Sequence, residues 1–196
     1  FTGRFPGKDE TDVPEGPLEL MFCCHCGLVQ LAHNFDADEL YRHHYGYRSG
    51  INASMRNHLA EIVTKIHAKT PLSNGDTVLD IGSNDGTLLG NYDIAGIRRI
   101  GFDPTIEQYG HFYPPEVCKI ADYFTAEGFH KVSESLAKVI TSISMFYDLP
   151  DPNAYVADIA SCLRKDGLWV LEQSYIIRML EQNAFDTICH EHLEYY

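Results

Sequence analysis

The spacing of apolar residues changes near residue 50 and again near residue 76. Between residues 51 and 70, apolar positions recur every three or four residues and predict one amphipathic helix whose stripe is Ile51, Met55, Leu59, Ile62, Val63 and Ile66. Pro71 and the turn sequence "LSNGD" after it predict the end of that helix. Before residue 50 no long period is present, and "LELMFCCHCGLVQL" predicts two short strands around a cysteine-rich turn.

After residue 76, short apolar runs alternate with helical segments. The predicted strands are 77–82, 98–103, 116–122, 137–144 and 168–174, and the predicted helices are 87–92, 106–112, 125–132 and 151–167, the last stopped by Gly167. Strands that alternate with helices pair in parallel through right-handed crossovers. The sequence therefore predicts a Rossmann-like α/β sheet, covered on both faces, over residues 51–196, preceded by a small separate domain over residues 1–50.

A glycine-containing turn follows the first predicted strand of this sheet. "VLDIGSNDGTLL" places Asp80, Gly82 and Gly86 at the carboxyl end of that strand, where open α/β sheets bind ligands. Asn84 stands where a dinucleotide-binding fingerprint requires its second glycine. This favours S-adenosylmethionine (SAM) over a dinucleotide, because the SAM ammonium group suits a carboxylate such as Asp80. Asp80, Gly82, Asn84 and Gly86 are therefore expected to bind SAM.

Two further acidic residues end the next two predicted strands. Asp103 is placed to accept hydrogen bonds from ribose hydroxyls, and Asp122 from the adenine amino group, with Phe124 beside the ring. The alternative interpretation is that Asp103 and Asp122 only cap the helices that follow them. Three carboxylates at three successive strand ends favour the SAM interpretation.

The charge balance excludes one class of partner. The 196 residues carry 15 basic and 28 acidic side chains, a net charge of −13, which disfavours nucleic-acid binding. No apolar run is long enough to span a membrane, and no secretory leader is visible, although the first residue is Phe1.

The cysteines fall into two groups. Cys118, Cys162 and Cys189 are scattered singly, as buried small hydrophobes usually are, and no secreted disulfide framework is indicated, so a reducing cytoplasm is expected. Cys23 and Cys26, followed by Gly27, form half of a structural zinc site, which needs four ligands. No second pair of this spacing is present; Cys24, His25 and His33 have unconvincing spacing, and a redox pair remains the alternative.

The sequence ends in a cluster of polar residues, "ICHEHLEYY". His190, Glu191 and His192 do not match the zincin motif, because the residue that would be its second histidine is Glu194. On an extended segment His190 and His192 share one face but lack a third metal ligand. A surface histidine pair without function is the simpler alternative, and the many neighbouring hydrogen-bonding groups favour a proton-transfer site.

The whole chain resembles the sugar-nucleotide C-methyltransferases that make branched deoxysugars. The resemblance rests on "GPLELMFCCHCGLVQL", similar to that family's N-terminal zinc-binding domain, and on "YGYRSGINASM", "LDIGSNDGTLL" and "FDTICHEHLEYY". It implies that His192 is the catalytic base with Glu191 beside it, and that Tyr45 or Tyr47 is lent to the active site. The family commonly has tyrosine where this chain has Cys189.

The same resemblance implies the extent of the chain and its chemistry. Family members carry a first cysteine pair upstream and a further α/β domain downstream, so this sequence is expected to be an interior piece with an unpaired sheet edge. The expected reaction is removal of a proton next to the ketone of a nucleotide-linked sugar by His192, with tyrosines or His190 donating to the enolate, followed by attack on the SAM methyl group. O- or N-methylation of a small metabolite, and a non-catalytic zinc-ribbon module, are the alternatives.

Overall fold

The computed structural model describes residues 6–11, 15–42, 45–185 and 187–196. The chain divides into two compact units. The first contains Phe1–Tyr47, Ser144–Pro150 and Gln173–Tyr196, and the second contains Arg48–Ile143 and Asp151–Glu172. These units differ from the division expected at residue 50, because residues 144–150 and 173–196 pack with the N-terminal segment rather than with the sheet.

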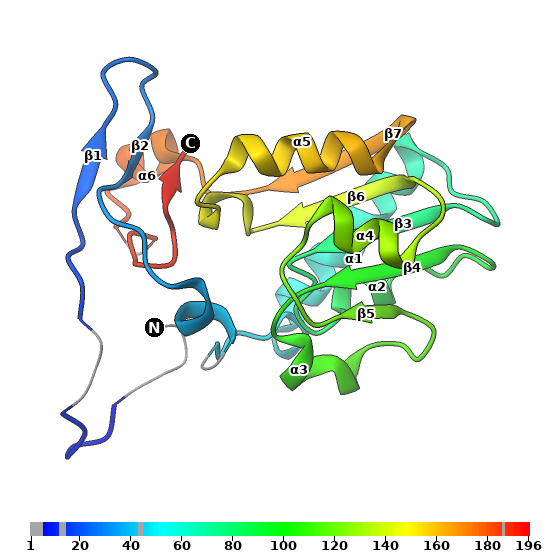
Figure 1. Cartoon of the computed structure of the whole chain (residues 1–196), viewed down its shortest axis with the longest axis horizontal. Coiled ribbons are helices and arrows are strands. Elements are labelled where there is room, and N and C mark those ends of the chain that lie inside the picture. The colour runs from blue at the N-terminus through cyan, green and yellow to red at the C-terminus, as the bar shows by residue number, and fades with distance from the viewer. Residues whose placement is uncertain (1–5, 12–14, 43–44, 186) are drawn as a thin grey trace. The chain divides into compact units, whose positions relative to one another are not determined.

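The second unit is built on one parallel sheet (Figure 1). Its strands, in the order β5-β4-β3-β6-β7, are β3 (Thr77–Ile81), β4 (Arg98–Phe102), β5 (Cys118–Ile120), β6 (Ala137–Ile143) and β7 (Leu163–Glu172). β3 pairs in parallel with both β4 and β6, so the strand order reverses at β3. The predicted Rossmann-like sheet is confirmed, and its switch point lies where the sequence places the glycine turn.

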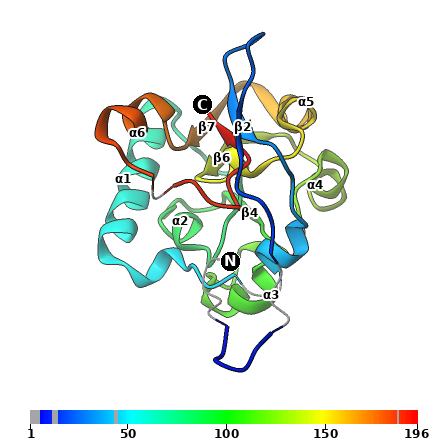
Figure 2. The same ribbon diagram turned by 90° about the vertical axis from the view of Figure 1, so that its left-hand side faces the viewer.

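Helices cover both faces of this sheet. α1 (Ala53–Lys69) and α2 (Thr87–Gly90) lie on one face, and α4 (Ala126–Val132) and α5 (Pro152–Cys162) lie on the other (Figure 2). α3 (Ile106–Tyr109) follows β4 and continues into a 3-10 helix, Gly110–Phe112. The largest core cluster joins α1 and α2 to the sheet through buried apolar residues that include Leu59, Ile66, Val78, Leu88 and Val139.

The start of α1 corrects one predicted core position. Ile51 lies in a separate 3-10 helix, Ser49–Ile51, and is 65% exposed. The side chain of Asn52 accepts a hydrogen bond from the Ser54 N–H and begins α1 at Ala53. The rest of the predicted stripe faces the core: Leu59, Ile62, Val63 and Ile66 are buried, and Met55 packs against them.

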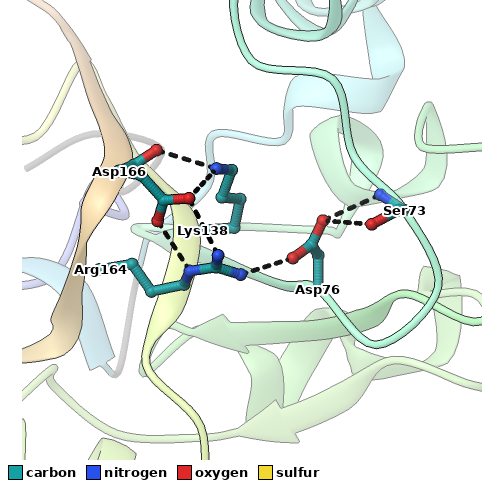
Figure 3. Close-up of polar contacts among 5 residues, drawn as sticks. All are labelled: Ser73, Asp76, Lys138, Arg164 and Asp166. Carbon is teal, nitrogen blue, oxygen red and sulfur yellow. Dashed lines mark hydrogen bonds and ion pairs between the residues drawn. The ribbon is translucent and has the colours of Figure 1, made fainter.

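The end of α5 differs from the sequence prediction. The helix stops at Cys162 rather than at Gly167, and residues 163–167 belong to β7. The pairing moves from Ala137↔Leu163 to Val139↔Leu168, so the chain bulges between them. Figure 3 shows what holds the bulge: Asp166 accepts from Lys138 (2.8 Å) and pairs with Arg164, whose other nitrogen donates to Asp76 (2.8 Å). These ion pairs stabilise residues 163–167 as a strand, although the local sequence favours a helix there.

The first unit contains a small antiparallel sheet in the order β1-β2-β8. Its strands are β1 (Leu20–Phe22), β2 (Val29–Leu31) and β8 (Glu194–Tyr195), and the two strands predicted around the cysteine turn are confirmed. The unit also holds a π-helical turn, Asp38–Arg42, a 3-10 helix, Phe146–Asp148, and α6 (Ile176–Gln182). Its buried core is formed by Leu31, Leu193 and Tyr195.

No helix in the described ranges combines the length and apolar character needed to cross a bilayer.

The ion-pair cluster in Figure 3 yields a stability prediction. Asp76 is buried and accepts from the Ser73 N–H, the Ser73 hydroxyl and Arg164. Asp76→Ala should lower the free energy of unfolding by about 1–3 kcal/mol, because it leaves these donors without their acceptor. Urea unfolding should show a lower midpoint with an unchanged slope.

The matched control removes an exposed ion pair. Glu61 lies 3.5 Å from Lys65 on the open surface of α1, so Glu61→Ala should cost at most about 0.5 kcal/mol. Equal losses in the two variants would contradict a special role for the Asp76 cluster.

Candidate functional site

The turn after β3 is built from three residues in the left-handed region. Gly82, Asn84 and Gly86 have φ values of 72°, 50° and 76°. Glycine is required at position 86 for two reasons: its φ is positive, and a Cβ atom there would lie 2.6 Å from the ring of Tyr113. The turn carries the chain from the end of β3 directly into α2, at the carboxyl edge of the sheet.

Asn84 is held in this unusual conformation from several directions. Its N–H donates to Oδ2 of Asp103 (2.8 Å), and its carbonyl accepts from the hydroxyl of Tyr113 (3.0 Å). Its side-chain Oδ1 accepts from the N–H of Ser49 (2.9 Å). Asn84 was predicted to bind the cofactor, and in this structure its amide oxygen anchors the segment that leads into α1.

Asp103 follows β4 and is buried. Besides Asn84, it accepts from the N–H (2.7 Å) and the hydroxyl (2.6 Å) of Thr105 through Oδ1. Burial raises the pKa of Asp103, and these three hydrogen bonds oppose the rise. Asp103 therefore closes the turn before α3, but it is not the N-cap of that helix, which is Thr105, so the alternative that Asp103 caps the helix is not what the structure has. The ribose role stays a prediction: Oδ1 already accepts two hydrogen bonds, whereas Oδ2, which accepts from Asn84, has a second lone pair.

Asp80 lies at the end of β3 and is 3% exposed. Its Oδ1 accepts from the hydroxyl of Thr141 on β6 (2.5 Å). Burial raises the pKa of Asp80 to about 7, the Thr141 hydrogen bond opposes the rise, and the neighbouring Asp103 carboxylate adds to it. A carboxyl group in this state gains strongly from a cationic ligand.

The residues predicted to bind adenine lie just after β5. Asp122 is exposed and accepts from the N–H of Tyr123 (2.9 Å). Phe124 is half-buried, and its ring makes edge contacts with Phe102 (5.5 Å between centroids) and Tyr155 (5.7 Å). Phe124 thus packs between an aromatic side chain of β4 and one of α5, and its adenine role stays a prediction.

Asp85 and Arg48 are residues of this region that the sequence analysis did not select. Asp85 is buried; its Oδ2 accepts from the Gly50 N–H (2.9 Å), and its Oδ1 accepts from the hydroxyl of Thr87 (2.6 Å). The Nε of Arg48 lies 3.5 Å from Oδ2 of Asp85. A Cβ atom on Gly50 would lie 2.6 Å from that same oxygen, so the sequence signal for the contact is the glycine of "RSG".

The terminal histidine cluster lies in the first unit and forms a turn, not a strand. The His192 N–H donates to the Cys189 carbonyl (3.3 Å), so His190 and His192 do not share a strand face as the extended interpretation required. His192 Nδ1 lies 2.7 Å from the carbonyl oxygen of Thr187. Because a carbonyl only accepts, Nδ1 carries the proton and Nε2 keeps its lone pair.

Burial lowers the pKa of His192, although the Thr187 hydrogen bond and the charge of Glu191 oppose this. The imidazole ring lies 4.3 Å from the ring of Tyr147. A neutral imidazole with a fixed tautomer is what a general base needs. The Thr187 carbonyl, rather than the expected Glu191 carboxylate, holds Nδ1.

His190 and Glu191 have different surroundings. His190 Nε2 donates to the carbonyl of Gly16 (3.0 Å), and its ring contacts Phe35 edge-on (4.8 Å). Glu191 is buried, and its backbone carbonyl accepts from the hydroxyl of Tyr41 (2.8 Å). His190 therefore holds the N-terminal segment against the turn and is a weaker candidate for the base than His192.

Further buried acids surround the turn. Asp148, in the 3-10 helix after β6, was not selected from the sequence. Burial raises its pKa well above the usual value; a hydrogen bond with Tyr41 opposes this, and the charges of Glu191 and Glu194 add to it. Burial also raises the pKa of Glu194 to about 7. The position of Asp148, shortly after the predicted strand 137–144, was the available signal.

The remaining predicted residues of this unit are Cys189 and the paired tyrosines. Burial raises the pKa of Cys189 to about 11, so its thiol is protonated at neutral pH. Tyr47 is 40% exposed, and its ring lies edge-on to that of Tyr45 at 6.4 Å. Tyr45 also contacts Tyr41 (5.6 Å), so the aromatic residues before the sheet form one cluster within the first unit.

The cysteine turn joins β1 to β2. The Cys23 N–H donates to the Leu28 carbonyl and the Gly27 N–H to the Cys23 carbonyl, both at 2.8 Å, with Gly27 at φ 81°. Backbone N–H groups of Cys26 and His25 lower the pKa of the Cys23 thiol. This geometry fits two thiolate ligands, but the described residues contain no group of three or more metal-ligating side chains.

Comparison with known proteins places the chain in a family. Residues 51–196 match the family model described as a methyltransferase domain. Over 182 residues, or 92% of this chain, the sequence is 32% identical to the C-methyltransferase NovU of Streptomyces niveus. The match covers 43% of NovU, so the chain spans less than half the length of this curated relative.

Two solved structures support the fold. The plantazolicin methyltransferase BpumL, in complex with a pentazolic desmethylPZN analogue and SAH, aligns with a TM-score of 0.55 at 13% identity, over 72% of this chain and 55% of that chain. The plantazolicin methyltransferase BamL, in complex with a triazolic analogue and SAH, aligns with a TM-score of 0.55 at 18% identity, over 71% and 53%. At these identities the likeness concerns the fold alone.

The raised pKa of Asp80 predicts a pH-dependent stability. The folded carboxyl, with a pKa of about 7 against an ordinary value of 3.8, binds its proton more tightly than the unfolded one does. The stability that Asp80 contributes therefore falls as pH rises from about 4 to about 7. Asp80→Asn cannot ionise, so the variant should be more stable than the wild type at about pH 8, by on the order of 1–3 kcal/mol, and should lose this advantage near pH 5. Urea unfolding at the two pH values measures the difference, and an equal difference at both would contradict a buried, ionising Asp80.

Proposed function

This chain belongs to the methyltransferase domain family, and we propose that it methylates a carbon atom of a nucleotide-linked keto-deoxysugar, with SAM as the methyl donor. The methyltransferase class is what the sequence predicted, and the family match confirms it. The sugar substrate and the enolate route are the proposal. The observation that carries it is the neutral His192, whose Nδ1 is held by the Thr187 carbonyl and whose Nε2 is left as a base.

The proposed SAM site is the carboxyl edge of β3, β4 and β5. The buried Asp80 faces the ammonium group, Asp103 the ribose, and Asp122 with Phe124 the adenine. Gly82 and Gly86, on either side of Asn84, let the backbone approach the ligand closely. The SAH in the plantazolicin methyltransferase complexes and the buried carboxylates of this site support the assignment.

The proposed reaction has two parts: removal of a proton from a substrate carbon, and attack of that carbon on the methyl group of SAM. SAM supplies an electrophilic methyl group when it is bound. Nε2 of His192 takes the proton from the carbon next to the substrate ketone, and the electron pair of that C–H bond forms the enolate. The enolate carbon then forms the new carbon–carbon bond as the methyl–sulfur bond breaks, and that bonding pair stays on sulfur. A base at carbon is needed for C-methylation, which is the activity in the name of NovU.

Hydrogen-bond donors are needed where the enolate charge develops. Asp148 is held protonated by burial, and one of its oxygens has no hydrogen-bond partner among the described residues. We assign it, with Tyr47, to the enolate oxygen, because a neutral acid donates at no cost in net charge. Glu191 is assigned an electrostatic role: its negative charge stabilises the imidazolium that His192 becomes after it takes the proton.

The chain leaves the second unit for the first at the ends of two strands. The chain passes from the second unit to the first directly after Ile143, the last residue of β6, and again after Glu172, the last residue of β7. Both exits are at carboxyl ends of parallel strands, the edge that carries the proposed SAM site. The histidine turn and Asp148 both belong to segments that begin at these exits.

Zinc is proposed only as a structural element. Cys23 and Cys26 fit half of a tetrahedral thiolate site, and no step of the reaction uses a metal. The remaining ligands are not supplied by a cluster in the part of the chain that the structure describes.

The base assignment gives a kinetic prediction. His192→Ala should lower turnover by about 10²–10⁴ while SAM affinity stays nearly constant, because the imidazole moves a proton and does not hold the cofactor. The decisive measurement is deuterium exchange from solvent at the carbon next to the ketone, with SAH in place of SAM, since it separates proton removal from methyl transfer.

His190→Ala is the matched control in the same turn and should retain exchange near the wild-type rate. Wild-type exchange in His192→Ala together with lost exchange in His190→Ala would move the base to His190. Methyl transfer by the wild type to an oxygen or nitrogen acceptor, without any carbon exchange, would instead indicate the alternative reaction.

The cysteine turn gives a composition prediction. Elemental analysis of these 196 residues should show well under one equivalent of tightly held zinc, because two thiolates alone bind the ion weakly. A full equivalent that is lost in Cys23→Ser would mean that residues such as Cys24, His25 or His33 complete the site.

A further inference from the structure

We propose that Arg48 is the anion-binding residue of the cofactor site and receives the carboxylate at the amino-acid end of SAM. This inference rests on the proposed SAM binding. Arg48 is the first residue of the second unit, directly before the 3-10 helix Ser49–Ile51. The comparisons and the glycine-turn motif do not point to it.

The guanidinium of Arg48 is fixed on two sides. Its carbon lies 3.9 Å from the centre of the Phe112 ring, so the aromatic face sets the position of its plane. Its Nε lies 3.5 Å from Oδ2 of Asp85, which is buried. A guanidinium held at its face and at Nε presents its two terminal nitrogens as a fork, which matches the geometry of a carboxylate.

The terminal nitrogens are available for a ligand. Among the described residues, no side chain or carbonyl accepts a hydrogen bond from them, and the Arg48 side chain is 25% exposed. The Nε pairs with Asp85 by charge, but it is buried and has no hydrogen-bond partner in the described part of the chain, so the guanidinium is incompletely satisfied without a ligand.

The position fits the amino-acid end of the cofactor. Asp85 belongs to the glycine turn. It accepts from the Gly50 N–H and pairs with the Arg48 side chain, so two contacts hold the segment 48–50 against the turn. Burial raises the pKa of Tyr109, the charge of Arg48 opposes the rise, and those of Asp85 and Asp103 add to it, so these charges lie in one neighbourhood. The ammonium group of SAM has the buried carboxylate of Asp80, whereas its carboxylate needs a cation, and Arg48 supplies one beside the same turn.

The test compares two ligands that differ only in the carboxylate. Isothermal titration without sugar substrate measures the affinity of the wild type and of Arg48→Gln for SAM and for decarboxylated SAM, in which hydrogen replaces the carboxyl group. Arg48→Gln should weaken SAM binding by about 10–100-fold, as expected for a lost bidentate charged pair, and should change the affinity for decarboxylated SAM by less than about 3-fold.

Arg56→Gln is the matched control. Arg56 Nη1 donates to the carbonyls of Gly50 (2.7 Å) and Ile51 (3.0 Å), so its loss loosens the same segment without removing an anion-binding group. It should weaken both ligands by the same factor. Thermal unfolding of both variants without ligand reports any general loss of structure.

The outcomes separate this inference from the proposed function. If the wild type binds neither ligand, the proposed SAM site fails and Arg48 loses its role with it. If the wild type binds SAM, but Arg48→Gln weakens both ligands equally or neither, SAM binding stands and the Arg48 assignment is overturned. A loss of nucleotide-sugar affinity with SAM affinity intact would overturn it as well, in favour of a substrate phosphate.

Discussion

The hydrogen bond from the Asn84 N–H to the Asp103 carboxylate is the contact on which the cofactor side of the molecule depends. It joins the turn after β3 to the end of β4 and holds a non-glycine residue in the left-handed region, which is unfavourable by itself. With Asn84 fixed, its side chain holds Ser49, and the next residue of the turn, Asp85, holds Gly50 and Arg48. If this bond were lost, the turn would relax and the segment leading into α1 would lose both anchors.

The second constraint is the burial of negative charge at one edge of the sheet. Asp80, Asp85 and Asp103 are all buried there, in a chain whose net charge is already −13. The raised pKa of Asp80 and Asp103 shows that their charged forms are destabilised in the ligand-free protein. A ligand with a sulfonium and an ammonium group relieves this, so part of the affinity for a cation is built into the fold before binding. The same acidity would repel the ligand's carboxylate unless a cation stood beside it, and this is the position of Arg48.

The sequence was sufficient where local pattern and tertiary structure agree. The five parallel strands and most of the buried stripe of α1 follow from periodicity, because both faces of the sheet are covered. The helix predicted through Gly167 failed because Lys138, Arg164, Asp166 and Asp76 come together only after the strands pair. Ile51 was misplaced because the Asn52 cap overrides the apolar spacing. Arg48 and Asp148 were missed because their local signals, the glycine of "RSG" and a position shortly after a strand, are weak. Their contacts are with residues 37 and more than 40 positions away.

The histidine turn shows how one burial effect can separate an acid from a base. Desolvation disfavours the charged form of every group, so it lowers the pKa of His192 and raises those of Asp148 and Glu194. Burial thus favours the unprotonated imidazole of His192 and the protonated carboxyl groups of Asp148 and Glu194, whereas free carboxyl groups in water are ionised near neutral pH. The Thr187 carbonyl then decides which imidazole nitrogen is free, and it does so without adding a charge. Position alone thus separates a group suited to removing a proton from groups suited to donating one, which is what the proposed enolate chemistry requires.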